Sequence, residues 1–240
     1  CGSYFNKIFN KKYSAEKLLP IGLLRSNLID ENLIRNRKFF LRVNSIKKNK
    51  KVVSLILITS TNNQKSDLYG EDGSSIKSLL NFENLIYNLE KNFKNKIHIV
   101  IKFKDTNFLY QDEFYEFEKR LKKFDNVEII KSNNISSANI ISISDIVIGS
   151  QSTIIEESLM KKKYSFIFDM ENFASTLGFY RHNKFYILKS IEKVVDSLLL
   201  IFNDDKEYID NYNKNRKTFI ENYLSDEGKI NSFDTLREKI

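Results

Sequence analysis

Hydrophobic positions along the chain alternate between short β-branched runs and longer segments with helical spacing. The short runs predict buried parallel strands, because such strands are apolar on both faces. The predicted strands are Val52–Thr59, Ile97–Phe103, Val127–Ile130, Asp145–Ile148, Ser165–Phe168 and Phe185–Leu188. Apolar residues spaced at i, i+3, i+4 and i+7 predict amphipathic helices between them. The predicted helices are Ser75–Phe93, Glu113–Phe124, Ala138–Ile143, Thr153–Met160 and Ile191–Phe202.

Strands separated by helices of this length indicate βαβ units and a parallel sheet. The expected fold class is therefore α/β, a Rossmann-like parallel sheet flanked by helices, over residues 46–204. Residues 1–45 carry mixed signals around Pro20 and Gly22, and are expected to be the end of a preceding domain and a linker. Residues 205–240 are highly charged with spaced apolar positions, and predict a C-terminal helical tail of two helices broken near Ser225–Gly228.

Composition fits one well-buried domain, or one domain with an appendage. Of 240 residues 41% are hydrophobic, and only 7 Gly and 1 Pro argue against disorder and against a many-turned all-β fold. No apolar run approaches the roughly 20 residues of a membrane span. Cys1 is the only cysteine, which excludes an internal disulfide and fits a cytosolic setting. The start at Cys1 without Met favours a fragment of a longer chain over a mature lipoprotein with lipid on Cys1.

The net charge of +8 bears on partners. Lys47–Lys51 and Lys161–Lys163 are the densest basic clusters, and a basic surface attracts the phosphates of nucleic acid, anionic lipid or a nucleotide. Lys, Asn and Ile are all abundant, as an AT-rich genome would produce. A solvated lysine-rich surface without a partner is therefore favoured over a phosphate-binding one.

Polar segments follow three of the predicted strands, at the edge where open parallel sheets bind ligands. They are Thr59–Asn63, in which Thr59 and Ser60 are further candidates, Lys102–Asp105 and Gly149–Thr153. In the third, Gly149 allows a tight turn and a close backbone approach. The free N–H groups of the following helix, with the hydroxyls of Ser150, Ser152 and Thr153, form a site for a diphosphate.

Two adjacent glutamates in this helix have different expected roles. Ser152 or Thr153 can cap the helix, and because Thr153–Glu156 fits the capping box T-x-x-E, Thr153 and Glu156 are expected to form the cap. Glu157 lies about 100° further around the helix, outside the box. It is a candidate acceptor for ribose hydroxyls.

Other chemistry is poorly supported by the residues. His98 lies inside a predicted strand, where a packed histidine is favoured over a ligand, and His182 lies in a predicted loop. Arg181 in that loop is one further candidate for a phosphate contact. No His/Cys/Asp/Glu spacing suggests zinc, and neither G-x-G-x-x-G nor G-x-x-x-x-G-K-[ST] occurs. We therefore expect no metal and no cofactor.

The segment ISISDIVIGSQSTIIEESLMKKKYSFIFD resembles the donor-site segment of GT-B glycosyltransferases and their relatives. Those relatives include UDP-N-acetylglucosamine 2-epimerase and the CDP-glycerol glycerophosphotransferases. The family pattern is matched by Asp145, Ser152, Thr153, Glu157, Leu159 and Lys163. Three positions depart from it: Ser158 replaces the usual Ala, Lys162 the usual Gly and Tyr164 the usual Pro. The segments YFNKIFNKKYSAEKLLPIGLLRSN and YLSDEGKINSFDTLREKI resemble the flanking linker and C-terminal helices, so the resemblance covers most of the chain.

The resemblance implies the C-terminal, donor-binding half of a GT-B fold. The expected function is transfer of a glycosyl or phosphopolyol group from a nucleotide sugar for surface polysaccharide or capsule synthesis. The donor-binding residues would be Lys102, Lys104, Gly149, Ser150, Ser152, Thr153 and Glu157. Many relatives carry a histidine after the second strand, where this chain has Lys102–Asp105, so the catalytic residues stay unassigned.

Partners follow from the same resemblance. They are the nucleotide sugar, a carbohydrate or lipid-linked acceptor, and an N-terminal domain of the same protein, which would be needed for activity. The expected location is the cytoplasm, with the inner face of the membrane as a further candidate surface, and no nucleic acid is expected. Two alternatives stay open: a sugar-nucleotide epimerase of the same fold, and a non-catalytic module that binds an anionic polymer or membrane surface.

Overall fold

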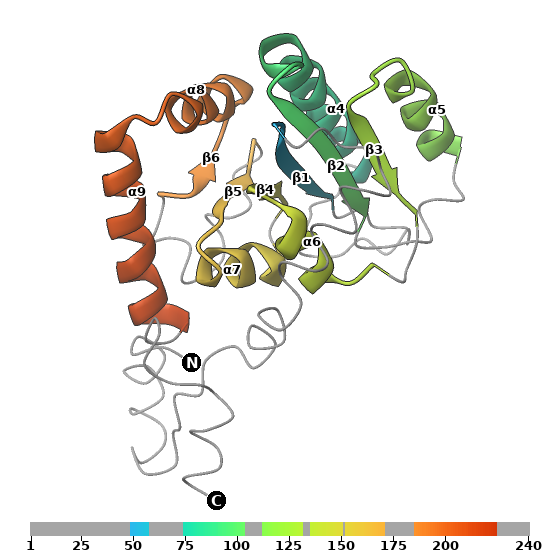
Figure 1. The fold of residues 1–240 in the computed structure, drawn as a ribbon. Coiled ribbons are helices and arrows are strands. Elements are labelled where there is room, and N and C mark those ends of the chain that lie inside the picture. The colour runs from blue at the N-terminus through green and yellow to red at the C-terminus, as the bar shows by residue number, and fades with distance from the viewer. Residues whose placement is uncertain are drawn as a thin grey trace, which may run out of the picture.

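A computed structural model shows a six-stranded sheet with the strand order β3-β2-β1-β4-β5-β6. It describes residues 49–57, 74–103, 112–131, 135–150, 152–170 and 185–224. The strands are β1 (Lys51–Leu57), β2 (Ile97–Phe103), β3 (Val127–Ile130), β4 (Ile146–Gly149), β5 (Tyr164–Phe168) and β6 (Ile187–Leu188). Neighbouring strands pair in parallel throughout, so the expected Rossmann-like sheet is confirmed (Figure 1).

Helices connect these strands as the hydrophobic spacing predicts. They are α4 (Ser74–Phe93), α5 (Asp112–Leu121), α6 (Ser137–Ile143), α7 (Thr153–Met160), α8 (Ile191–Phe202) and α9 (Lys206–Phe219). The predicted elements differ from these mainly at their ends. Helix α5 ends at Leu121 and leaves Phe124 in the connection to β3, and Phe185 lies in a turn before β6. The last predicted residues of the first strand lie outside the described residues.

The helices pack on two faces of the sheet, which makes the core. On one face, Phe103 of β2 contacts the rings of Phe114 and Phe117 in α5. On the opposite face, the Ser165 hydroxyl of β5 donates to the Ser158 hydroxyl of α7. Residues Val52–Leu57 of the central strand β1 lie between these layers and are almost fully buried, as coverage of a parallel sheet on both faces requires.

The beginning of the C-terminal tail is helical and packs on the sheet, as expected. Helix α9 runs beside β6 and the end of the sheet (Figure 1). It buries Tyr212, Arg216 and Phe219 along one stripe, and a π-helical turn, Ile220–Leu224, follows it. The predicted break near Ser225–Gly228 lies outside the described residues.

Helix α7 ends in a Schellman motif whose left-handed residue is a lysine. The N–H of Lys162 donates to the Leu159 carbonyl at 3.1 Å, and the N–H of Lys163 donates to the Ser158 carbonyl at 3.0 Å. These bonds require the left-handed conformation that Lys162 adopts, with φ 57°. A side chain is strained there, which explains physically why glycine is usual at this position in the resembling family.

Lys162→Gly should therefore stabilise the protein by about 1 kcal/mol, because glycine has no Cβ to clash in the left-handed region. The matched control is Lys161→Gly, since Lys161 has φ −87° and gains nothing from glycine. Denaturant unfolding should show a higher midpoint for the first variant and an unchanged or lower one for the second. A lower midpoint for Lys162→Gly would contradict the strain argument.

Candidate functional site

The strand order reverses between β1 and β4, and the polar loop that follows β4 lies at this point. In open parallel sheets, such a reversal leaves a crevice at the carboxyl ends of the strands. Gly149 ends β4 and pairs with Ile56 near the end of β1. The candidate segment Gly149–Thr153 therefore starts at the carboxyl edge of the sheet, at the point where the strand order reverses.

Gly149 allows the loop to cross directly against β1. A Cβ at this position would lie 2.7 Å from the Ile56 carbonyl oxygen and 2.9 Å from the Ile56 Cβ. The backbone of Gly149 does not need a left-handed φ, so space and not turn geometry requires the glycine. This close approach allows a hydrogen bond from the next residue, since the Ser150 N–H donates to the Ile56 carbonyl at 3.1 Å.

Helix α7 begins one residue earlier than the capping box requires. Ser152 is the N-cap, with extended backbone angles, and Thr153 is the first helical residue. The predicted box between Thr153 and Glu156 is therefore wrong. The physical reason is the position of Thr153 in the helix. A capping side chain accepts an N–H of the first turn from the residue just before the helix, and Thr153 is already the first helical residue.

Helix geometry leaves N–H donors at the first turn of α7 that suit an anion. The Ser152 side chain makes no capping hydrogen bond, and the Ile155 N–H is bonded to the Ser152 carbonyl at 2.9 Å. The N–H groups of Thr153 and Ile154 precede it, where helix geometry provides no intrahelical acceptor. With the positive end of the helix dipole, these donors suit a phosphate.

Both glutamates of α7 are buried, which the sequence did not indicate. Glu156 is 7% exposed and Glu157 is 3% exposed, and both take part in polar interactions. A charged carboxylate in such a place needs partners to offset its lost hydration. Both residues therefore support the packing of α7, and Glu157 has little surface left for a ligand.

Lys102 lies near the end of β2, in the same row across the sheet as Gly149. Ile56 of β1 pairs with Lys102 on one side and with Gly149 on the other. Side chains in one row of a parallel sheet point to the same face, so Lys102 shares the face of α7. Burial lowers the pKa of Lys102, because its charged form loses hydration. A nearby phosphate would raise this pKa and favour the charged form of Lys102.

The remaining candidates fall into two groups. Lys104, Thr59, Ser60 and Arg181, and also His182, lie outside the described residues. His98 lies in β2 with its side chain buried, 3.6 Å from the Glu128 carboxylate on β3. It is placed for packing, as expected.

Asp145, one of the residues that match the family pattern, has a structural role. Its carboxylate accepts the Val52 N–H at 2.8 Å, and its own N–H donates to the Val52 carbonyl at 2.9 Å. These bonds join the start of β1 to the residue before β4. Asp145 therefore lies at the amino edge of the sheet, opposite the candidate site.

A buried polar chain behind α7 was missed by the sequence reasoning. Ser158 bonds the carbonyls of Ile154 and Ile155 and receives the Ser165 hydroxyl at 3.0 Å. Ser165 is in turn bonded to the hydroxyl of Tyr212 on α9. The signal available in the sequence was Ser158 itself, a hydroxyl where the pattern has Ala.

No cluster of metal-ligating side chains occurs among the described residues. Within the same part of the chain, no helix is long and apolar enough to cross a membrane.

Comparisons with known proteins agree with the geometry at the level of fold. No family model matches the chain, and no curated protein matches its sequence significantly. A structure of the wall teichoic acid polymerase TagF soaked with CDPG matches 99% of this chain with a TM-score of 0.62 and 16% identity. The UDP-GlcNAc 2-epimerase from Neisseria meningitidis, bound to UDP-GlcNAc, matches 97% with a TM-score of 0.61 and 16% identity.

The chain spans about half the length of these structures, 55% of the polymerase and 57% of the epimerase. Identities this low show the fold alone. The fold that the sequence resemblance implied is thus confirmed: the chain has the Rossmann-like α/β fold shared by these two proteins.

Proposed function

We propose that this chain is the donor-binding part of a glycosyltransferase, or of a phosphopolyol transferase, that acts in surface polysaccharide synthesis. The observation that carries the proposal is the meeting of the Gly149–Thr153 loop and the start of α7 at the reversal of strand order. In that crevice the helix would hold the diphosphate of a nucleotide-activated donor.

The N–H donors of α7 and the charge of Lys102 would stabilise a nucleotide diphosphate as it leaves the donor. Negative charge develops on the diphosphate as the donor bond breaks, and fixed N–H donors stabilise such charge without reorganisation. Lys102 on the same face would add a point charge. No described residue is assigned as a catalytic base, and acceptor and base would come from an N-terminal domain of the same protein.

Titration of the chain with nucleotides tests the proposal. A donor site should bind UDP, CDP or GDP forms with a clear preference for one base, measured by calorimetry. A module that binds only charge should show no preference among them, and its affinity should follow ionic strength alone. Uniform, salt-controlled binding would therefore remove the transferase proposal.

Glu157→Gln should weaken nucleotide binding about five- to thirty-fold if the carboxylate accepts the ribose hydroxyls. The reason is that charge-assisted hydrogen bonds contribute roughly 1.5–3 kcal/mol against about 1 kcal/mol for neutral ones. The matched control is Glu156→Gln, one residue away in the same helix. Because both carboxylates are buried, both variants should also lose thermal stability, and affinity should be compared well below their unfolding temperatures.

Calorimetry separates the two roles. Loss of affinity in Glu157→Gln but not in Glu156→Gln would support a ribose contact. Equal affinity in the wild type and Glu157→Gln would leave Glu157 a packing residue, and the donor site would then rest on Gly149–Thr153.

The fold match to an epimerase bound to UDP-GlcNAc favours a second candidate, a sugar-nucleotide epimerase. An epimerase changes a UDP-sugar without an acceptor. Incubation of the full-length protein with UDP-GlcNAc alone, followed by chromatography of the sugar, would distinguish the two. Conversion without acceptor would favour the epimerase, and conversion only with a carbohydrate or lipid-linked acceptor would favour the transferase.

A further inference from the structure

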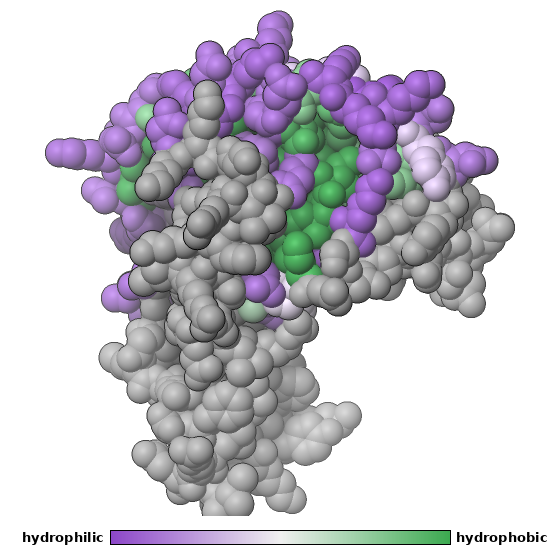
Figure 2. All heavy atoms as spheres, turned by 45° about the vertical axis from the view of Figure 1, so that its right-hand side comes forward, coloured by the Kyte–Doolittle hydropathy of each residue, from purple (hydrophilic) through white to green (hydrophobic). Residues whose placement is uncertain are grey.

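Three hydroxyl groups, on α7, β5 and α9, form a chain in the interior of the molecule. Most polar side chains of the described residues lie on the outside, as Figure 2 shows for one face. Ser158 and Ser165, by contrast, are fully buried, and Tyr212 is almost fully buried. A buried hydroxyl costs free energy unless it is hydrogen-bonded, and all three are bonded. We call these three residues the hydroxyl chain.

The hydroxyl chain begins on α9 and crosses to α7. The Tyr212 hydroxyl accepts the Ser165 N–H and donates to the Ser165 carbonyl, so it fixes the start of β5. The Ser165 hydroxyl then donates to the Ser158 hydroxyl on α7. The π-helical turn Ile220–Leu224, which continues α9, also packs on α7. The C-terminal helix is therefore tied to α7 at two places.

The other end of the chain lies in the first turn of α7. The Ser158 hydroxyl lies 2.7 Å from the Ile154 carbonyl oxygen and 2.8 Å from the Ile155 carbonyl oxygen. The peptide group that carries the Ile154 carbonyl also carries the Ile155 N–H, which donates to the Ser152 carbonyl at 2.9 Å. Consecutive hydrogen bonds of this kind polarise and strengthen one another. The hydroxyl chain thus reaches Ser152, the N-cap residue in the proposed donor loop.

The Ser158 hydroxyl affects the shape of the first turn more than the stability of the fold. A serine that bonds the carbonyl four residues earlier often bends a helix and adds nothing to its stability. Without this hydroxyl, Ser165 would keep an acceptor, because its own hydroxyl lies 3.2 Å from the Lys163 carbonyl. The resembling family has alanine at this position. We therefore expect that the hydroxyl can be removed without unfolding the protein.

We propose that the hydroxyl chain positions the first turn of α7 for the diphosphate of the donor. The inference rests on the proposed function, because it concerns the same site. The N–H groups of Thr153 and Ile154 would contact the phosphates. Tyr212, Ser165 and Ser158 would contact no part of the donor and are positioning residues. The position of α9 would in this way control the affinity of the donor site.

Calorimetric titration with UDP, CDP and GDP tests the proposal. Ser158→Ala should bind the preferred nucleotide about three- to tenfold more weakly, the scale of one hydrogen bond, with an unfolding midpoint near that of the wild type. Tyr212→Phe should weaken binding by a similar factor at a temperature where it is fully folded. The double variant should bind no more weakly than the weaker single variant, because both changes break one chain. Additive losses, or unchanged affinity in Ser158→Ala, would overturn the proposal.

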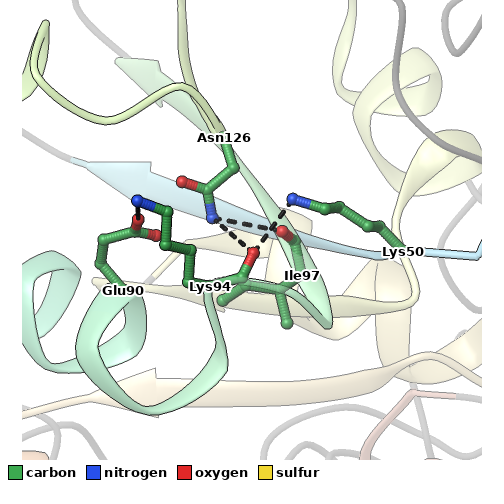
Figure 3. A network of polar contacts seen from close by, with 5 residues as sticks. All are labelled: Lys50, Glu90, Lys94, Ile97 and Asn126. Atoms are coloured by element: carbon green, nitrogen blue, oxygen red, sulfur yellow. Dashed lines mark hydrogen bonds and ion pairs between the residues drawn. The ribbon is translucent and has the colours of Figure 1, made fainter.

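The control for lost stability lies at the opposite edge of the sheet (Figure 3). The Asn126 amide there donates to the carbonyls of Lys94 and Ile97, and the Lys50 ammonium donates to the same Lys94 carbonyl. Asn126→Ala removes two hydrogen bonds, as Tyr212→Phe does, but touches no element of the donor site. It should lower the unfolding midpoint and leave nucleotide affinity unchanged. An equal loss of affinity in both variants would show that reduced stability alone weakens binding, and would overturn the proposal.

Hydrogen exchange of the Ile155 amide, measured by NMR without nucleotide, separates this proposal from the transferase proposal. Ser158→Ala should speed this exchange about three- to tenfold and leave the amides of α5, on the other face of the sheet, unchanged. Faster exchange in a protein that binds none of the three nucleotides would support the hold of the chain on the turn and contradict the donor site. Unchanged exchange with unchanged nucleotide affinity would contradict the positioning role and leave the donor site standing.

Discussion

Tyr212→Phe should lower the free energy of unfolding by about 2–4 kcal/mol. The Tyr212 hydroxyl accepts the Ser165 N–H at 2.7 Å and donates to the Ser165 carbonyl at 3.0 Å. Further along β5, the N–H groups of Ile167 and Asp169 donate to Tyr186 and Leu188. At Ser165, β6 does not yet lie beside β5, and the Tyr212 hydroxyl of α9 makes the hydrogen bonds that a neighbouring strand would otherwise make. Phenylalanine would leave two buried backbone groups without partners.

The matched control is Tyr208→Phe, one turn earlier on the same helix. The Tyr208 hydroxyl bonds the side chain of Ser197 and not a strand backbone, and Tyr208 is only half-buried. Its loss should cost about 1 kcal/mol or less. Denaturant unfolding of both variants measures the difference. Similar losses would show that the hydroxyl of Tyr212 does not complete the sheet.

The same hydroxyl predicts a dependence on alkaline pH. Burial raises the pKa of Tyr212 above its usual value, because the ionised phenolate would lose hydration. A tyrosine in the unfolded chain ionises near pH 10. The stability from the neutral hydroxyl is therefore fully present below about pH 10 and is lost as the pH rises further. The difference in unfolding free energy between wild type and Tyr212→Phe should be constant below about pH 10 and shrink above it.

Gly149→Ala should lower the free energy of unfolding by about 3 kcal/mol, which is the upper end of what an extra methyl group in a well-packed core costs. The added Cβ would meet the backbone oxygen of Ile56 at 2.7 Å, and a strand backbone in the middle of the sheet cannot move aside cheaply. Separation of β1 and β4 would also disturb the start of α7. Nucleotide binding should therefore weaken together with stability.

Ser150→Ala is the control for this prediction. Ser150 is half-buried, and the hydrogen bond that it makes with Ile56 uses its backbone N–H, which alanine keeps. Chemical unfolding should find its stability close to that of the wild type. If the Gly149→Ala protein were as stable as the Ser150→Ala protein, a methyl group would fit between the loop and β1, and the clash argument would be wrong.

The secondary structure could be predicted because it follows from local spacing. The run Ile97–Phe103 was predicted with its observed ends, since a buried parallel strand is apolar on both faces. Helix ends were predicted less well. Phe124 fits the apolar stripe of α5, but it lies beyond the end of the helix and packs against Tyr87 from there. The spacing of apolar residues shows which face of a helix is buried. It does not show where the helix ends, because a residue beyond the last turn can pack into the same core.

The position of the candidate loop in the sheet could be predicted, but the state of its residues could not. A glycine and hydroxyls after a predicted strand placed the loop at the carboxyl edge, and the sheet order then put that loop at the reversal between β1 and β4. The capping box was wrong, because a match to T-x-x-E does not fix which residue starts the helix. The burial of Glu156 and Glu157 was not visible, because it depends on what packs around α7.

The sequence by itself determined the class of fold, the alternation of strands and helices, and the segments that carry polar residues at strand ends. These properties depend on the order of residues over a few turns or one strand. Tertiary structure alone decided what distant segments do together. It joined Tyr212 to Ser165 across 47 positions in the chain and Lys50 to Lys94 across 44. The physical reason is that hydrogen bonding and burial depend on distance in space, and a parallel sheet brings every strand start to one edge and every strand end to the other.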